Sequence, residues 1–276
     1  MPAKVRTLLA TMAIVLLAGC AASGTSTQLS TAEALDKVLA GDQRSAADRA
    51  RDVYRHPKET LLFFGIRPEM TVVEVWPEAG WYTEVIAPLV NARGRYYAAQ
   101  PPANPANKFA TEMLKSYADR LAAHPELYGG TVVTAFGPNN PELAPPGSAD
   151  LVVTFRNLHN WMAADFAPKA LQSIFLALKP GGVLGIVEHR GKGGDQDPKA
   201  KSGYVNEDYA IRLIESAGFR LVAKSEINAN PRDTKDYEQG VWTLPPTYRL
   251  GDKDREKYAA IGESDRFTLR FVKPKP

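Results

Sequence analysis

Several side chains that could bind a ligand or move a proton follow directly after apolar runs in this sequence. Arg156, Asn157 and His159 follow the run at residues 150–155, and His189 follows a later one. Histidine is the best candidate for a general base because its ordinary pKa lies near neutrality. The amide of Asn157 could orient the ring of His159, and an arginine in such a place can bind a carboxylate or a phosphate.

Each of these residues also has a structural interpretation. His159 could only anchor a loop by hydrogen bonding, and Arg156 could form an ion pair with an acid of the protein itself. The segment Glu188-His189-Arg190 could complete an acceptor pocket, but charged residues after a strand are often simply solvated. The sequence leaves both interpretations open.

The sequence gives little support for metal binding or covalent catalysis. Its four histidines show no paired ligand spacing, although His159 and His189 could converge in space. Cys20 is the only cysteine, and no Gly-x-Ser-x-Gly segment occurs. We therefore predict no metal site, no internal disulfide, and neither a thiol nor a serine nucleophile in the folded domain.

These candidate residues need a scaffold, and the clearest part of it is the stretch at residues 72–86. An apolar run that contains Glu74 is followed by the turn Trp-Pro-Glu-Ala-Gly at 76–80, and apolar residues at helical spacing come next. This pattern predicts strand, tight loop and helix. In an open α/β sheet, ligands lie beyond the carboxyl ends of the strands, beside the N-terminus of the following helix.

The rest of the chain alternates in the same way. We expect strands at residues 71–75, 95–99, 131–136, 150–155, 183–188, 219–223 and 266–272. We expect helices at 31–41, 45–54, 56–64, 82–89, 107–123, 166–178, 206–218 and 252–257. Strands that alternate with helices favour an α/β fold with a mainly parallel sheet and helices on both faces. An irregular insert at 228–251 is typical of a functional lid or an interaction surface.

This order of parts resembles the class I, seven-strand, Rossmann-like methyltransferases that depend on S-adenosylmethionine. The most specific single match is Leu-Lys-Pro-Gly-Gly at 178–182, ahead of the fifth strand. Trp-Pro-x-x-Gly-Trp-Tyr-Thr at 76–83, Arg-Asn-Leu-His-Asn-Trp at 156–161 and Gly-Tyr-Val-Asn at 203–206 are similar to a group of exported bacterial methyltransferase-like proteins.

The resemblance implies S-adenosylmethionine as cofactor and assigns residues to it. The implied cofactor-binding residues are Glu74, Trp76, Pro77, Gly80, Trp81, Gln100, Phe155 and Arg156. The implied acceptor is a small molecule near Asn157, His159 and His189. The chain departs from the family where Trp76 and Glu78 replace loop glycines and where Gln100 replaces the acid that binds the ribose.

The first thirty residues suggest export and anchoring. Lys4 and Arg6 precede a short apolar segment, and Leu-Ala-Gly-Cys at 17–20 resembles a bacterial lipobox. We therefore expect a lipoprotein signal peptide at 1–20, lipid on Cys20, a flexible tether at 21–30 and the methyltransferase-like domain at 31–276. The resemblance implies a periplasmic protein anchored to the outer membrane of a Gram-negative host.

The charge composition limits the classes of partner that the sequence supports. The formal net charge is only +3, and it falls when Lys4 and Arg6 are set aside, so the sequence offers no case for nucleic-acid binding. Oligomeric state is not readable from the sequence. Two functions stay open: a methyltransferase for a small-molecule acceptor, and an exported non-catalytic ligand-binding or structural protein on a methyltransferase scaffold.

Overall fold

The computed structural model of the protein describes residues 29–276. The expected signal peptide, the cysteine expected to carry lipid (Cys20) and most of the expected tether lie outside the described residues. The division of the chain into these segments and one domain remains a prediction.

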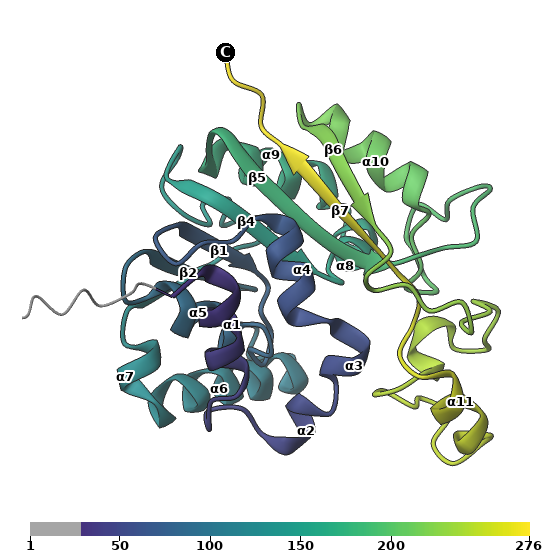
Figure 1. Ribbon diagram of the computed structural model, residues 1–276. Helices are drawn as coiled ribbons and strands as arrows, with labels where there is room; N and C mark the ends of the chain where they lie inside the picture. The colour runs from purple at the N-terminus through teal and green to yellow at the C-terminus, as the bar shows by residue number, and fades with distance from the viewer. Residues whose placement is uncertain (1–28) are drawn as a thin grey trace, which may run out of the picture.

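Seven strands form one sheet in the order β3-β2-β1-β4-β5-β7-β6 (Figure 1). They are β1 (Thr71–Val75), β2 (Arg95–Gln100), β3 (Thr131–Ala135), β4 (Ala149–Phe155), β5 (Leu178–His189), β6 (Arg220–Ser225) and β7 (Arg266–Val272). The pairs from β3 to β5 are parallel, and β7 runs antiparallel to both β5 and β6. This confirms the predicted Rossmann-like α/β fold with a mainly parallel seven-strand sheet.

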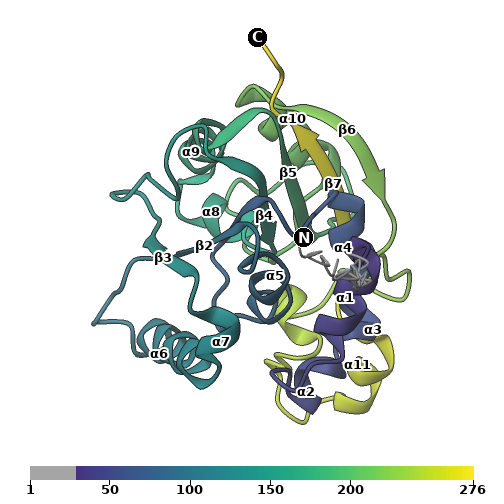
Figure 2. The ribbon, with the colours of Figure 1, turned by 60° about the vertical axis from the view of Figure 1, so that its left-hand side comes forward.

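Helices cover both faces of the sheet (Figures 1 and 2). In chain order they are α1 (Thr31–Leu39), α2 (Ala46–Arg49), α3 (Asp52–Arg55), α4 (Pro57–Phe64), α5 (Thr83–Val90), α6 (Lys108–Ala123), α7 (Pro125–Tyr128), α8 (Leu158–Ala163), α9 (Ala167–Ala177), α10 (Glu207–Ser216), the 3-10 helix η1 (Gly240–Thr243) and α11 (Arg255–Ile261). The buried residues form two clusters. One lies against α8, α9 and α10, and the other lies against α1, α4 and α5.

The two clusters follow from the alternation of side chains along each strand. In β1, Val73 and Val75 belong to the cluster under α9, whereas Val72 belongs to the cluster under α5. Glu74 shares the face of Val72, and so its carboxyl group is buried between the sheet and α5. A strand with both faces covered has apolar residues on both faces, and β1 shows this pattern at Val72, Val73 and Val75, with Glu74 as the exception.

The structure corrects some predicted boundaries. The helix expected at 45–54 is two short helices, because Arg51 donates its backbone N–H to Asp48, three residues back, and this tighter turn interrupts the α-helical ladder. Strand β5 begins earlier than expected, since Leu178 already pairs with Ala149 of β4. Helix α8 was not predicted.

The segment that follows the predicted insert lies beside the N-terminal helices. In both views α11 lies close to α3 (Figures 1 and 2). Arg51, which precedes α3, forms an ion pair of 2.6 Å with Glu263, which follows α11. Segments from the two ends of the chain therefore meet beyond the carboxyl ends of β4 and β5.

Candidate functional site

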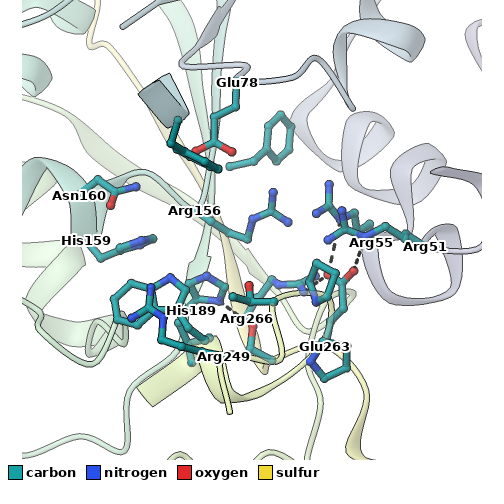
Figure 3. Close-up of a pocket in the computed structure, with 18 residues that line it drawn as sticks. Arg51, Arg55, Glu78, Arg156, His159, Asn160, His189, Arg249, Glu263 and Arg266 are labelled. Carbon is teal, nitrogen blue, oxygen red and sulfur yellow. Dashed lines mark hydrogen bonds and ion pairs between the residues drawn. The ribbon is translucent and has the colours of Figure 1, made fainter. Parts of the chain in front are cut away.

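A cavity of about 580 Å³ lies at the carboxyl edge of the sheet (Figure 3). Its wall comes from the end of β4, the start of α8, the end of β5, helix α3 and the insert, through residues such as Phe155, His159, His189, Arg55 and Trp242. The volume falls within the range of about 300–1,000 Å³ that is usual for small-molecule sites. The cavity is thus large enough for a small-molecule ligand.

His159 and Glu188 form a hydrogen-bonded pair at the cavity wall. Nδ1 of His159 lies 3.0 Å from Oε1 of Glu188, whose carboxylate is fully buried. The same carboxylate accepts the backbone N–H groups of His159, at 3.2 Å, and of His189, at 2.8 Å. An ionised carboxylate accepts a hydrogen bond from Nδ1–H, so Nε2 is the nitrogen left to act as a base. Glu188 would then orient the ring and stabilise the imidazolium.

His189 lies next to this pair. Its ring centroid is 5.4 Å from that of His159, and its Nδ1 lies 2.6 Å from Oγ of Ser264. Burial lowers the pKa of His189 well below its ordinary value, and the charges of His159, Arg266 and Arg156 lower it further. His189 is therefore a neutral side chain that can hydrogen-bond a ligand.

His159, Glu188 and His189 are also the described residues that could hold a metal ion. Their ligand atoms all lie within 4.8 Å of one another. However, both oxygens of Glu188 already accept hydrogen bonds, and the arginines around His189 oppose a divalent cation. The arrangement favours a hydrogen-bonded acid–base group over a metal centre.

Asn157, the third predicted catalytic residue, points away from the cavity. Its buried amide donates to the backbone oxygen of Val75 at 2.9 Å and to Oγ1 of Thr154 at 3.1 Å. These bonds join the end of β4 to the end of β1. Asn160, rather than Asn157, lines the cavity beside His159.

The loop between β1 and α5 keeps a glycine-like backbone without the glycines. The φ angles of Trp76, Glu78 and Gly80 are +50°, +55° and +88°. The indole of Trp76 donates to the backbone oxygen of Phe136 at 2.9 Å and packs against Phe166. The side chain of Trp76 therefore joins the loop after β1 to the segment after β3.

The acid and the amide that the resemblance assigned to the cofactor are bonded within the protein. Glu74 accepts hydrogen bonds from Tyr96, at 2.5 Å, and Thr83, at 3.1 Å, and burial raises its pKa to about 7 against these bonds. Gln100 is 3 % exposed and donates to the backbone oxygen of Glu78 at 2.9 Å. Oε1 of Gln100 is enclosed and has no hydrogen-bond partner among the described residues.

The remaining predicted cofactor residues divide into two groups. Phe155 and Arg156 line the cavity. Pro77, Gly80 and Trp81 are buried and do not line it. A Cβ on Gly80 would lie 3.0 Å from the ring of Tyr117, so this glycine allows close packing of α6. Trp81 donates its indole N–H to Asp48 at 3.1 Å.

Sequence reasoning missed the cationic part of the wall. Arg51, Arg55, Arg249, Glu263 and Arg266 all face the cavity, although they come from distant parts of the chain. The four-residue spacing of Arg51 and Arg55 places both on one side of a helical turn, which was the one available signal. Nothing in the sequence paired them with Glu263.

Comparison with known proteins gives similarity of structure only. No protein-family model matches the sequence, and no curated protein is similar to it in sequence. An S-adenosylmethionine-dependent methyltransferase from Aquifex aeolicus superposes with a TM-score of 0.56 and 16% identity, over 89% of this chain and 100% of its own.

Two further solved structures show the breadth of this fold. The [4+2]-cyclase SpnF gives a TM-score of 0.57 at 15% identity over 88% of this chain and 93% of its own. Phosphoethanolamine N-methyltransferase 2 of Haemonchus contortus, solved with S-adenosyl-L-methionine, gives a TM-score of 0.54 at 17% identity, over 90% of this chain and 61% of its own. The chain therefore has the Rossmann-like fold of the S-adenosylmethionine-dependent methyltransferases.

Proposed function

We propose that the protein is an S-adenosylmethionine-dependent methyltransferase that acts on a small-molecule acceptor in the cavity. The observation that carries this proposal is the His159–Glu188 pair, which opens into a ligand-sized cavity at the carboxyl ends of β4 and β5. In an open α/β sheet this edge is where ligands bind.

Two side chains that face the cavity fit the cofactor. Glu78, of the β1–α5 loop, offers a carboxylate to its amino group, and Phe155, at the end of β4, offers an apolar surface. When bound, the cofactor supplies a methyl group on a positively charged sulfur. Nε2 of His159 would accept the proton of an acceptor that arrives protonated, and the buried carboxylate of Glu188 would stabilise the resulting imidazolium.

A second candidate is a ligand-binding protein on the same scaffold, without methyl transfer. The observation that favours it is that Glu74 and Gln100, assigned to the cofactor by resemblance, bond to Tyr96, Thr83 and the backbone of Glu78 instead. S-adenosylmethionine is also made in the cytoplasm, so an exported enzyme would need a supply of it.

Calorimetric titration of the full-length protein in detergent with S-adenosylmethionine and S-adenosylhomocysteine tests the first candidate. We expect micromolar binding. His159→Gln keeps a donor for Glu188 and should retain this binding while methyl transfer falls by about 10²- to 10⁴-fold. Folded protein that binds neither compound would refute the methyltransferase and favour the second candidate.

We also propose that the protein is held in the periplasm by lipid on Cys20, at the outer membrane. The support is the sequence at 1–20 alone. Within residues 29–276, no helix has both the length and the apolar character needed to cross a bilayer.

A further inference from the structure

The cavity wall carries far more positive than negative charge (Figure 3). Only two acids, Glu78 and Glu263, line it among the described residues. Against them stand five arginines: Arg51, Arg55, Arg156, Arg249 and Arg266. Because ionised side chains are rarely buried without partners, the arrangement of these charges indicates what the cavity accepts.

One acid serves three of the arginines. Glu263 lies 2.6 Å from Nε of Arg51 and 3.5 Å from Nε of Arg55, and it also pairs with Arg266. Burial alone would raise the pKa of Glu263, but the three guanidinium groups lower it below its ordinary value. This carboxylate is ionised and shared, so it cannot neutralise any further cation.

The buried arginines keep hydrogen-bonding capacity that the protein does not use. Arg55 and Arg266 are each 3 % exposed. Within residues 29–276, Nε of Arg266 has no hydrogen-bond partner, and Nε of Arg55 has only its ion pair of 3.5 Å with Glu263. Burial lowers the pKa of Arg55 well below its ordinary value, and Arg156 is the neighbouring charge that lowers it most. These cations repel one another in the ligand-free protein.

Two arginines of the wall, Arg156 and Arg249, form no ion pair with an acid among the described residues. The guanidinium carbon of Arg249 lies 4.4 Å from the ring centroid of Trp242. The backbone of Arg156 is left-handed, with φ of +62°, and its N–H is held by the backbone oxygen of Val187 at 2.7 Å. Its guanidinium group points into the middle of the cavity, between His159 and Arg55 (Figure 3). Backbone strain of this kind is found where a side chain must be aimed.

We propose that Arg156, together with Arg55 and Arg266, binds an oxyanion, and that the natural ligand is a small molecule that carries a carboxylate or a phosphate. The anion would supply the missing negative charge, and guanidinium groups bind both kinds of oxyanion in a bidentate manner. The rest of the ligand would lie beside His159. Oxyanion binding itself does not depend on methyl transfer, whereas its assignment to the methyl acceptor rests on the proposed function.

Calorimetry of the full-length protein with inorganic phosphate and with acetate, at constant ionic strength set by sodium chloride, tests oxyanion binding. We expect saturable binding that Arg156→Gln weakens by about tenfold or more. The matched control is Arg95→Gln, which should bind phosphate like the wild type. It removes the same charge from an exposed position at the N-terminal end of β2, on the edge of the sheet opposite the cavity. Equal binding by all three proteins, or no saturable binding by the wild type, would overturn the proposal.

Arg249→Gln provides a second variant if Arg156→Gln does not fold. It lies on the insert, outside the sheet, and should also weaken phosphate binding because it removes a cation from the same wall. Phosphate binding unchanged by this variant would count against the arginine cluster.

Competition separates the source of the oxyanion. If phosphate binds equally to protein saturated with S-adenosylhomocysteine, the site serves the acceptor as proposed. If the two compete, the arginines serve the carboxylate of the cofactor and the acceptor assignment fails. Absence of S-adenosylhomocysteine binding would refute methyl transfer, but the phosphate titration would still decide oxyanion binding.

Discussion

Burial sets the charge state of individual side chains at the carboxyl edge of the sheet. Glu74 and His189 are both pushed toward their neutral forms, the first mainly by burial and the second by burial together with neighbouring cations. Each shift makes the stability of the protein depend on pH, with opposite signs.

Glu74→Gln should abolish one of these dependences. The pKa of Glu74 is raised to about 7 from 4.5, so the folded protein loses stability as the pH rises between these values. In urea unfolding, the free energy of unfolding of Glu74→Gln should rise relative to that of the wild type between pH 5 and pH 8, by at most about 3 kcal/mol. Glu112→Gln, on the exposed surface of α6, is the control and should show no such gain. A constant difference between variant and wild type would contradict the prediction.

His189 should respond to the removal of a cation. Because the charge of Arg156 lowers the pKa of His189, Arg156→Gln should raise it. The folded protein with neutral His189 loses stability as the pH falls below the ordinary histidine pKa of about 6.5. The free energy of unfolding of Arg156→Gln should fall less over the same pH range. The Cε1 proton of His189, assigned with His189→Gln, reports the pKa by NMR. No shift relative to Arg95→Gln would show that the two charges do not interact.

At the scale of elements, the loop between β1 and α5 holds a strained path. Trp76 and Glu78 adopt positive φ angles that glycine takes without strain. Trp76 is compensated by its hydrogen bond to Phe136 and by packing against Phe166. Among residues 29–276, the exposed side chain of Glu78 forms no hydrogen bond or ion pair that would compensate its backbone strain.

Glu78→Gly should therefore stabilise the protein. Relief of the left-handed conformation is worth about 1 kcal/mol, partly offset by the greater freedom of glycine in the unfolded chain. Glu78→Ala is the matched control, since it removes the carboxylate and keeps the Cβ. Thermal unfolding should place the glycine variant above the alanine variant. The reverse order would mean that φ at this position carries no strain.

At the scale of the whole molecule, the cavity is closed by the two ends of the domain. Arg51 and Arg55, near its start, meet Glu263 and Arg266, near its end. A ligand held here would contact the sheet, the N-terminal helices and the insert together. Ligand binding should thus tie these segments to one another.

The proposed N-terminal anchor also concerns the whole chain. Cys20→Ser should release the protein from the membrane fraction into the soluble periplasmic fraction, because serine cannot carry the thioether-linked lipid. Fractionation with immunoblotting measures this, and Ser23→Ala is a control that leaves the cysteine in place. Retention of Cys20→Ser in the membrane fraction would refute lipid anchoring at this residue.

Local patterns were enough to predict the sheet and most of its helices. Neighbouring residues alone encode the apolar run at β1, the turn after it and the Leu-Lys-Pro-Gly-Gly turn before the apolar part of β5. Local patterns also predicted a strand and a helix that the structure confirms as β4 and α6. The strand order and the antiparallel direction of β7 came only from the structure, but parallel strands with helical connections bring their carboxyl ends to one edge. For this reason His159 and His189 could be expected to lie close together.

Tertiary structure alone decided which side chains face the cavity. Glu74 and Gln100 point into the protein because Tyr96, Thr83 and the strained loop supply partners from across the fold. The arginine cluster depends on contacts over more than 200 positions, such as that of Arg51 with Glu263. Sequence patterns report the neighbours along a helix or strand, whereas burial and charge pairing depend on which distant segments meet.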